Sequence, residues 1–530
     1  MLLVISIICA FTLLVWVKHF KKSPYSQLPG PKEHPLFGNV LQIRLDHILK
    51  DFETWAWEHG PIFRLNLLSR QALVVSDTQM INDILKARPE GFSRGENFAN
   101  QFKEFDVHAV FTLEDTEWKH ARYWVAMAFT PAKVRQYTKC IWHNSKKLME
   151  KLTDLSATQK ALLQERSLTP SLPAETISHR HIYKDNDMTE SIITEIQSAI
   201  LSIICGLSFS WGDKDFLSPA VLDDCKVLLS RMFERALCLI PFWKIYPTER
   251  DIIAKNTSSM FRKRIQTLMD KEYKLPDQDK GETRTFLESL LRCSQDESNQ
   301  SSKAGAHPLS DEQIKANLLI VVIAGYETTS SVMRAVLYEL AIDVEYQERV
   351  RQEVQKAFGN VRELDIENDI EIVEQVANAP EVHVPLIMAF MQEILRIHSP
   401  ASLLLLSSRK DQMIQGVHIT KGTDIYLLTR VATFRSWPNS NPWKFDPAQW
   451  LSEDKEQIKA MKSVDLSFGN GPRVCPGRHL AEKELVILIS LIVANFRISV
   501  IDTPPHVGSV TEKFWFIPYV TNLHIRLEPI

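Results

Sequence analysis

Helical periodicity dominates the pattern of apolar and polar residues along this chain. Apolar residues recur every three to four positions over residues 190–205, 314–341 and 481–496, and this spacing predicts long helices with a buried face. Two short segments near the start, 62–67 and 72–76, instead have the pattern of strands in a small sheet. Because no internal repeat and no linker to a second domain is seen, we expect one mainly α domain with a minor β-sheet.

Residues 2–17 form an uncharged apolar run, and the basic cluster 18–22 follows it directly. Eleven of these sixteen residues are Leu, Ile, Val or Phe, a composition that favours membrane insertion by about 3 to 7 kcal/mol. A cleaved signal peptide carries its positive charge before the apolar run and a small-residue cleavage site after it, and neither is present. We therefore expect an uncleaved single-pass anchor at residues 1–22, with a lumenal N-terminus and a cytosolic body.

A Pro-rich connector at residues 23–40 follows the anchor, and its prolines and glycines exclude a continuous helix. The polar tract 294–310 is expected to be a solvated loop before the central helix. We expect the remainder, residues 41–530, to form a single domain.

Composition and charge argue against several classes of protein function. The chain has 530 residues, of which 45% are hydrophobic and 24% are charged, so it can bury a large core. A net charge of −3 gives no electrostatic support for nucleic-acid binding. The seven cysteines show neither paired spacing nor a regular framework, which argues against a zinc site or disulfides and favours a reducing compartment for the body.

One of these cysteines, Cys475, lies in a loop of unusual composition, residues 468–477, which we call the Cys475 loop. Glycines allow close backbone approaches, so that main-chain N–H groups can point at the sulfur, while Pro472 and Pro476 stiffen the loop. A thiolate that is sheltered in this way suits a metal, and Arg473 can reach a nearby carboxylate of a cofactor. The alternative is a buried structural cysteine in a Gly/Pro turn.

The central helix contains a second unusual segment. Ser310 and Gln313 fit a capping box at its start. Further along, Ala324-Gly325-Tyr326-Glu327-Thr328-Thr329 interrupts the apolar pattern, although Gly costs up to about 1 kcal/mol in a helix relative to Ala. Ala324, Gly325 and Thr328 share one face, which predicts a groove for a flat cofactor with a hydroxyl at its edge. The alternative is close packing of another helix at Gly325.

Together these motifs resemble the cytochrome P450 family in its membrane-anchored microsomal form. The Cys475 loop fits the family signature, and Ala324 to Thr329 fits its oxygen-binding helix. Glu393 and Arg396 fit the Glu-x-x-Arg helix, and Trp118 and Arg122 fit a helix that holds a haem propionate. The resemblance covers essentially the whole chain and implies the mainly α cytochrome P450 fold, with haem b as cofactor between the central helix and the Cys475 loop.

By this resemblance, Cys475 is the axial ligand of the haem iron, and Arg473, Trp118 and Arg122 bind propionates. Phe468, Gly477, Ala324 and Gly325 also contact the haem. Thr328 is expected to hydrogen-bond bound dioxygen, and Glu327 is expected to link it to solvent for proton delivery.

Two positions depart from the family pattern. Gln449 stands where an arginine usually joins Glu393 and Arg396, so the third charge of that structural group is missing. Leu406 stands where many microsomal members place an arginine for the second propionate, and Arg409 is offset from that position.

The resemblance implies a monooxygenase that inserts one oxygen atom of O2 into a lipophilic small molecule. No flavin or nicotinamide motif occurs in the chain, so we expect electrons from a partner, NADPH-cytochrome P450 reductase, with cytochrome b5 as a further donor, at the endoplasmic reticulum membrane. The segment 237–246 is expected either to touch the bilayer or to be core. The cations expected to dock the reductase are Lys119, Lys133, Lys462, Arg478 and Lys483.

An apolar substrate pocket is expected around Ile320, Ile323, Ala324, Thr328 and residues 401–405, including Ala401, Leu403 and Leu404, with residues 98–111 above it. Two rival functions remain. A haem-thiolate isomerase or dehydratase acts on peroxides without a reductase and needs no Glu327–Thr328 pair. A non-enzymatic haem sensor needs neither a pocket nor a partner.

Overall fold

The computed structural model describes residues 24–530 except 36, 69, 168–173, 210–218, 239–240, 275–284, 296–308, 502–510 and 515–516. The expected anchor at residues 1–22 and most of the expected loop 294–310 therefore lie outside the described residues.

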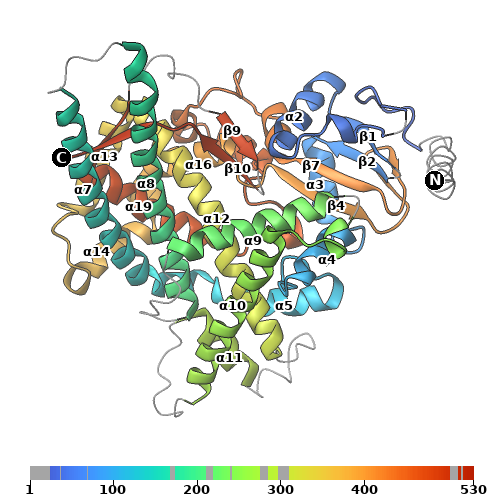
Figure 1. The fold of residues 1–530 in the computed structure, drawn as a ribbon, viewed down its shortest axis with the longest axis horizontal. Helices are drawn as coiled ribbons and strands as arrows, with labels where there is room; N and C mark the ends of the chain where they lie inside the picture. The colour runs from blue at the N-terminus through green and yellow to red at the C-terminus, as the bar shows by residue number, and fades with distance from the viewer. Residues whose placement is uncertain are drawn as a thin grey trace.

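Helices make up most of the described chain, as the periodicity predicted (Figure 1). The three segments expected to be helical fall in α8, α12 and α19, and α19 ends at Asn495, one residue before the predicted end. The larger helices are α2 (Ile48–His59), α3 (Thr78–Lys86), α4 (Glu96–Glu104), α5 (Asp115–Ala128), α7 (Thr138–Ser167), α8 (Ala174–Phe209), α9 (Pro219–Leu237), α10 (Glu249–Tyr273), α11 (Phe286–Gln295), α12 (Asp311–Ile342), α13 (Val344–Phe358), α14 (Ile366–Asn378), α16 (Pro385–Ile397), α18 (Lys455–Val464) and α19 (Arg478–Asn495). Shorter helices are α6 (Pro131–Gln136), α15 (Pro380–His383) and α17 (Thr429–Arg435).

The main sheet has five strands in the order β1-β2-β7-β4-β3. The predicted strands at 62–67 and 72–76 appear as β1 (Ile62–Leu67) and β2 (Arg70–Val75), which pair antiparallel. β2 pairs parallel with β7 (Asp424–Leu428), and β7 pairs antiparallel with β4 (Leu403–Ser408), whose other neighbour is β3 (Phe92–Ser93). Three two-stranded ladders complete the described strands: β5 (Gln412–Ile414) with β6 (Val417–Ile419), β9 (Thr511–Phe514) with β10 (Pro518–Thr521), and β8 (Phe496–Val500) with β11 (Ile525–Pro529).

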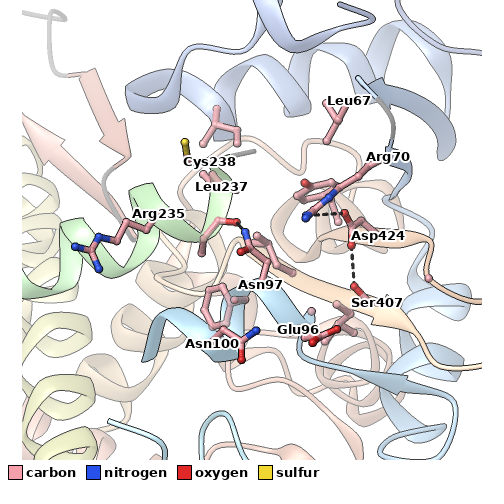
Figure 2. Close-up of a pocket in the computed structure, with 18 of the residues that line it drawn as sticks. Leu67, Arg70, Glu96, Asn97, Asn100, Arg235, Leu237, Cys238, Ser407 and Asp424 are labelled. Atoms are coloured by element: carbon pink, nitrogen blue, oxygen red, sulfur yellow. Dashed lines mark hydrogen bonds and ion pairs between the residues drawn. The ribbon is translucent and has the colours of Figure 1, made fainter. Parts of the chain in front are cut away.

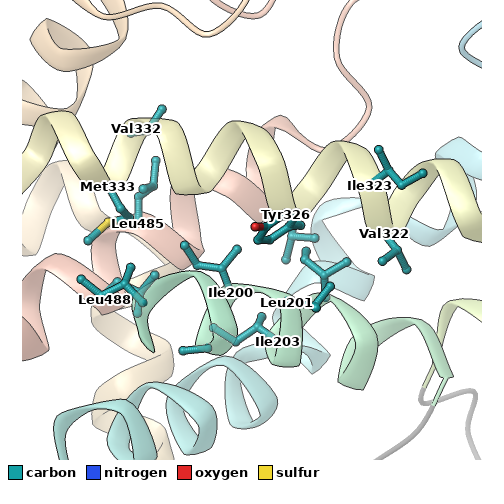
Figure 3. Packing of buried hydrophobic residues seen from close by; sticks show 14 of the residues in the cluster. Ile200, Leu201, Ile203, Val322, Ile323, Tyr326, Val332, Met333, Leu485 and Leu488 are labelled. Atoms are coloured by element: carbon teal, nitrogen blue, oxygen red, sulfur yellow. The ribbon is translucent and has the colours of Figure 1, made fainter. Parts of the chain in front are cut away.

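The central helix α12 runs through the helical core, and most of its residues are buried. The predicted capping box begins it: the Gln313 backbone N–H donates to Ser310 Oγ at 3.3 Å, and the Ser310 N–H donates to Gln313 Oε1 at 2.9 Å. Figure 3 shows Tyr326 and Met333 of α12 among apolar side chains of α8, with Leu485 of α19 nearby. These residues are almost completely buried, so each contributes roughly 1.5 to 3 kcal/mol of hydrophobic stabilisation.

Two described segments, Thr189–Phe209 and Asp311–Ile342, are long and apolar enough to cross a membrane. Their apolar windows are 72% and 78% buried inside the protein, respectively. Both segments are therefore core helices of the folded domain.

Candidate functional site

The Cys475 loop takes the tight backbone path that its glycines predicted. Gly469 and Gly471 have φ angles of +73° and +72°, which side-chain-bearing residues rarely adopt. A Cβ atom on Gly471 would lie only 2.7 Å from the carbonyl oxygen of Leu85, so a larger residue cannot fit there. The Cys475 N–H donates to the Phe468 carbonyl at 3.0 Å, and this bond closes the loop just before α19.

The Cys475 thiol is accessible to solvent although it lies deep in the protein. Burial raises its pKa, whereas the Gly477 N–H, which donates to the sulfur, and the cations Arg122 and Arg478 favour the thiolate. The predicted main-chain donor to the sulfur is therefore present. A deep yet accessible sulfur with cations beside it fits an axial ligand better than a packed structural cysteine.

The three residues expected to bind propionates all lie beside this loop. Arg122 Nη2 donates to the Val474 carbonyl at 2.8 Å, next to Cys475. The Arg473 guanidinium lies 4.5 Å from the centre of the Trp118 ring. Trp118 therefore packs against Arg473, while Arg122, four residues further along α5, donates to the loop backbone.

One carboxylate, Glu114, contacts Arg473 and two arginines that the sequence did not point to, Arg88 and Arg94. Glu114 Oε1 accepts hydrogen bonds from the Arg94 backbone N–H at 2.7 Å and from Arg88 Nη2 at 3.3 Å. Glu114 Oε2 forms an ion pair with Arg473, whose Nη2 also donates to the Leu113 carbonyl at 2.6 Å. Arg88, Arg94 and Arg473 thus gather around a single negative charge.

This arginine group has more positive charge than its surroundings balance. Burial and the neighbouring arginines hold the pKa of Arg94 well below its usual range and lower the pKa of Arg473 to about 9, and burial also lowers the pKa of Arg88. Within the described part of the chain, the Nε atoms of all three arginines are buried without a hydrogen-bond partner. Buried guanidinium groups with unused donors are suited to binding anions, and the two propionates of haem are anions of the right kind.

Arg409, the offset arginine, contacts the edge of this group. Its guanidinium forms a two-bonded ion pair with Asp115 at 2.5 and 2.8 Å and donates to the Pro89 carbonyl at 3.0 Å. Leu406 is buried in the small core beneath the sheet. Neither position offers the unpaired cation of the usual pattern, whereas Arg94, whose guanidinium lies 4.1 Å from the centre of the Phe111 ring, keeps an Nε donor with no partner among the described residues.

Ala324 and Thr328 interrupt the buried middle of α12. Ala324 is exposed and Thr328 is half-buried, and the Thr328 hydroxyl donates to the Ala324 carbonyl at 2.8 Å. Gly325 has a different role, because a Cβ atom on it would lie 2.8 Å from Ile204 Cδ1 of α8. The expectation that Gly325 joins Ala324 in a cofactor groove is therefore wrong: Gly325 lets α8 pack closely, which was the alternative interpretation.

Glu327 is buried next to Thr328. Burial raises its pKa to about 7, and Lys226 and Arg334 oppose this shift. Its Oε2 atom is buried with no hydrogen-bond partner among the described residues. Arg334 also pairs with the exposed Glu190 of α8 at 3.1 Å. A carboxyl that titrates near neutral pH, with charged groups leading outward, is suited to passing protons.

The Glu-x-x-Arg match is a fully buried pair. Glu393 and Arg396 are joined by two bonds, and Arg396 also donates to the carbonyls of Pro442 at 2.5 Å and Lys444 at 2.9 Å. Ser467, the residue just before the Cys475 loop, donates to the carbonyl of Leu395 in α16 at 3.1 Å. The pair therefore holds the segment around residues 442–444 against α16, and Ser467 joins the start of the Cys475 loop to the same helix.

Gln449 completes this group without adding a charge. Its Nε2 donates to Glu393 Oε1 at 2.9 Å, as its amide chemistry predicted. Its Oε1 accepts from Trp437 Nε1 at 3.0 Å and from Asn439 Nδ2 at 2.5 Å. An arginine has no acceptor and cannot replace this second function.

The expected docking cations differ in accessibility. Lys119, Lys462 and Arg478 are exposed, and Lys133 is half-buried. Lys483 is buried, and its ammonium group donates to Thr138 Oγ1 at 2.9 Å and to Asn378 Oδ1 at 2.5 Å. The expectation that Lys483 belongs to a docking surface is therefore wrong, because its charge is used inside the protein.

A large cavity of about 1170 Å³ lies between the main sheet, α4 and the end of α9 (Figure 2). Of the expected pocket segments, Phe98, Asn100 and Leu405 line it. The other named pocket residues, Ile320, Ile323, Ala401, Leu403 and Leu404, are not among the described residues that line it. Their place beside the haem remains a prediction.

Comparisons with known proteins find relatives across most of this chain. The family model described as cytochrome P450 matches residues 28–508. Cytochrome P450 3A17 of Cavia porcellus is 25% identical over 480 residues, covering 88% of this chain and 85% of that protein. Cytochrome P450 3A7 of Homo sapiens is 23% identical over 473 residues, with the same coverage of 88% and 85%. The crystal structure of the cytochrome P450DA heme domain superposes with a TM-score of 0.71, at 18% identity, over 95% of this chain and 98% of that one.

Proposed function

Because this chain belongs to the cytochrome P450 family and is a haem-thiolate monooxygenase, we propose that it oxidises a lipophilic small molecule with electrons from NADPH-cytochrome P450 reductase. The reaction inserts one atom of O2 into a C–H or C=C bond, and the second atom leaves as water with two electrons and two protons. The observation that carries the assignment of the site is the deep, accessible Cys475 thiol beside a buried surplus of arginine charge.

We assign the residues around the haem as follows. Cys475 is the axial ligand, and Phe468 and Gly477 shelter it on the loop. Arg473, Trp118 and Arg122 bind propionates, together with Arg88 and Arg94. The buried Nε donors and lowered pKa values of the arginine group support this assignment. Ala324 of α12 faces the haem from the opposite side. Arg94 supplies the cation that Leu406 does not.

When bound, thiolate-ligated haem b supplies the electron-rich iron that favours O–O cleavage. Residues of the chain itself position hydrogen-bond donors and move protons. The Thr328 hydroxyl donates a hydrogen bond to the Ala324 carbonyl. By rotating about its C–O bond, it can instead donate toward the haem side of α12. Glu327, with its pKa raised to about 7, can take a proton from the solvent side and return to its neutral form near physiological pH. Arg334 favours the charged form of Glu327 and pairs with the exposed Glu190, so the solvent side of Glu327 lies toward these residues.

We further propose that residues 1–22 anchor the protein in the endoplasmic reticulum membrane and that residues 41–530 form one cytosolic catalytic domain. Residues 23–40 connect the anchor to this domain. Ile245 and Tyr246, in the segment expected to touch the bilayer, are 75% and 78% exposed and support this contact. Trp243 of the same segment is buried and donates to Glu104 at 3.2 Å, so that part of the segment is core.

We propose that the reductase docks through cations on the side of the protein where Cys475 lies. Lys119, Lys133, Lys462 and Arg478 are available, whereas Lys483 is not. Charge complementarity of this kind mainly raises the association rate, so the rate of reduction should fall as ionic strength rises. Cytochrome b5 is proposed to use the same surface.

Isotope labelling tests the proposed function. Candidate lipophiles are first screened for a shift of the haem to high spin on binding. A compound that binds is then incubated with the protein, NADPH and reductase under ¹⁸O2. Incorporation of one ¹⁸O atom per product, dependent on reductase, supports the monooxygenase. Conversion of a hydroperoxide without reductase, with no ¹⁸O2 incorporation, identifies the isomerase or dehydratase instead. Ligand binding with no turnover of any kind identifies a sensor.

A further inference from the structure

Charged side chains from separate elements form one connected row. In order along the row, these are Glu339 of α12, His398 at the end of α16, Glu512 of β9, Arg430 of α17 and Glu53 of α2. Each contact joins an acidic group to a basic one. We call the antiparallel pair of β9 and β10 the β9–β10 hairpin (Figure 1). Because Glu512 lies in the middle of the row, the row ties this hairpin to the helices around it.

His398 is the member of the row whose ordinary pKa lies closest to neutral. Its Nε2 lies 2.9 Å from Glu339 Oε1, and its Nδ1 lies 3.5 Å from Glu512 Oε1. A neutral imidazole carries one N–H and one lone pair, so it can donate to only one of these two carboxylates. A carboxylate oxygen at each ring nitrogen is therefore satisfied only by the imidazolium form, in which both nitrogens donate.

The two contacts of His398 differ in strength. The Glu339 side chain is 7% exposed and lies within hydrogen-bond distance, whereas the Glu512 side chain is 30% exposed and its longer contact is an ion pair without hydrogen-bond geometry. The proton on Nδ1 is thus the less strongly held of the two. Once Nδ1 loses this proton, its lone pair faces the Glu512 carboxylate, and the contact is no longer attractive.

Arg430 keeps Glu512 in the row when His398 is neutral. Arg430 Nη1 donates to Glu512 at 2.8 Å, and its Nε and Nη2 donate to Glu53 at 2.8 and 2.9 Å. Since arginine stays protonated, these bonds persist above neutral pH. The row then holds three carboxylates against one cation instead of two. We therefore expect the hairpin to loosen without detaching.

The surroundings of His398 favour its charged form around neutral pH. Burial alone would lower its pKa below 6.5, but the carboxylates of Glu339 and Glu512 raise it. Burial alone would raise the pKa of Glu512, but Arg430 and His398 lower it to about 2. A histidine pKa that is raised on folding stabilises the contact fully below about pH 6.5, and this contribution is lost as pH rises through the raised value.

The β9–β10 hairpin also contacts two other parts of the helical core. The Ser331 hydroxyl of α12 donates to the Pro518 carbonyl at 2.6 Å. The Phe514 ring packs edge-on against Phe233 of α9, with 5.3 Å between ring centres. Ser331 lies about one turn after Thr328 on α12. A change in how firmly Glu512 is held can therefore reach α9 and α12.

We propose that His398 is a pH-dependent clamp: its imidazolium form holds the β9–β10 hairpin to α16 and α12 through Glu512 and Glu339, and loss of one proton to solvent loosens the hairpin. No covalent bond of the chain changes in this step. The clamp needs neither haem nor turnover, so it stands or falls independently of the proposed function.

Hydrogen–deuterium exchange of the haem-loaded full-length protein tests this inference. Exchange of the β9 and β10 amides is read by peptide mass spectrometry at pH 6 and pH 9, and each rate is divided into the intrinsic chemical rate at that pH to give a protection factor. Protection of the hairpin should fall about tenfold from pH 6 to pH 9, as expected for one partly exposed charge-assisted hydrogen bond. Helix α13, which contains no histidine, is the internal reference for global changes.

Three variants identify the group that titrates. His398→Gln cannot carry a charge, so protection of the hairpin should be low and equal at both pH values. Glu512→Gln can accept from Arg430 through its oxygen and donate to neutral His398 through its amide, so protection should stay high at both pH values. His418→Gln is the matched control and should behave as the wild type, because His418 is exposed on β6.

Cleavage by trypsin after Lys513 gives a second measure of hairpin loosening, because Lys513 is exposed on β9. At pH 7, His398→Gln should be cleaved there faster than the wild type, and Glu512→Gln should not. The inference is overturned if the wild-type hairpin, relative to α13, has the same protection at both pH values. It is also overturned if His398→Gln or Glu512→Gln keeps the wild-type pH dependence, or if His398→Gln and the wild type are cleaved at the same rate.

Discussion

The guanidinium of Arg396 lies 2.6 and 2.8 Å from the two carboxylate oxygens of Glu393, and both side chains are completely buried. Glu393 Oε2 also accepts from Trp450 Nε1 at 2.9 Å, and Glu393 Oε1 accepts from the Asp446 N–H at 2.8 Å. The pair therefore connects α16 to the segment before the Cys475 loop through several bonds that water does not reach.

Replacing Arg396 by alanine should be severe. The change leaves Glu393 as a buried, unpaired charge, a situation that typically costs about 3 to 5 kcal/mol. We expect Arg396→Ala to lose haem or to fail to fold, as measured by haem occupancy of the purified protein. Arg349→Ala is the control, because Arg349 is exposed on α13. Normal haem occupancy in Arg396→Ala would show that the pair is dispensable.

Cys475→Ala should lose the red-shifted Soret band that a thiolate ligand gives to the reduced carbon monoxide complex. Cys238→Ala, which changes a cysteine outside the Cys475 loop, should keep it. The measurement is the reduced carbon monoxide difference spectrum of each variant. Retention of the band in Cys475→Ala contradicts the ligand assignment.

Thr328→Ala should bind haem normally but divert electrons to peroxide, because the variant lacks the hydroxyl proposed to assist O–O cleavage. The measurement is product formed per NADPH consumed, with reductase and a confirmed substrate. Thr329→Ala is the matched control, because Thr329 is the next residue on α12 and is buried away from that face. Thr328→Ser should restore coupling, and equal coupling in all variants rules out the role.

Glu327 should make stability depend on pH in a defined direction. Its folded-state pKa is about 7 and its ordinary value is 4.5, so the folded state holds the proton more tightly than the unfolded state does. Stability therefore falls as pH rises from 4.5 to 7, and the full penalty, about 2 to 4 kcal/mol, is present above pH 7. Glu327→Gln should raise the melting temperature relative to the wild type more at pH 8 than at pH 5.5. An equal difference at both pH values contradicts a raised pKa.

Deleting residues 1–22 should release most of the protein from membranes, because the apolar run accounts for about 3 to 7 kcal/mol of insertion energy. Haem binding should persist. If a fraction still sediments with membranes, Ile245→Ser combined with Tyr246→Ser should reduce it, since both side chains are exposed. Sedimentation and carbonate extraction measure each step. A truncated protein that resists carbonate extraction contradicts the single anchor.

The sequence predicted those parts of the site that depend on local chemistry. The capping box at Ser310 and the positive φ angles at Gly469 and Gly471 each follow from a residue and its near neighbours. These features are encoded within a few positions, so a single sequence is enough to predict them.

The sequence did not predict contacts between distant segments. Arg473 meets Glu114 across 359 residues, and the arrangement of Arg88 and Arg94 around the same carboxylate is visible only in the fold. Lys483 resembled a surface charge because its partner Thr138 lies 345 positions away. Charged side chains are particularly difficult to place, because burial depends on partners that periodicity does not reveal.

The alternation of side chains along β7 divides its residues by the kind of evolutionary change they tolerate. Ile425 and Leu427 face the small core beneath the sheet, so substitutions there are limited by packing. Asp424 and Tyr426 project from the opposite face and line the cavity, although Tyr426 also packs against Phe52 of the core. A change at Asp424 can therefore alter the cavity lining while the strand keeps its register, whereas a change at Tyr426 alters the lining and the core together.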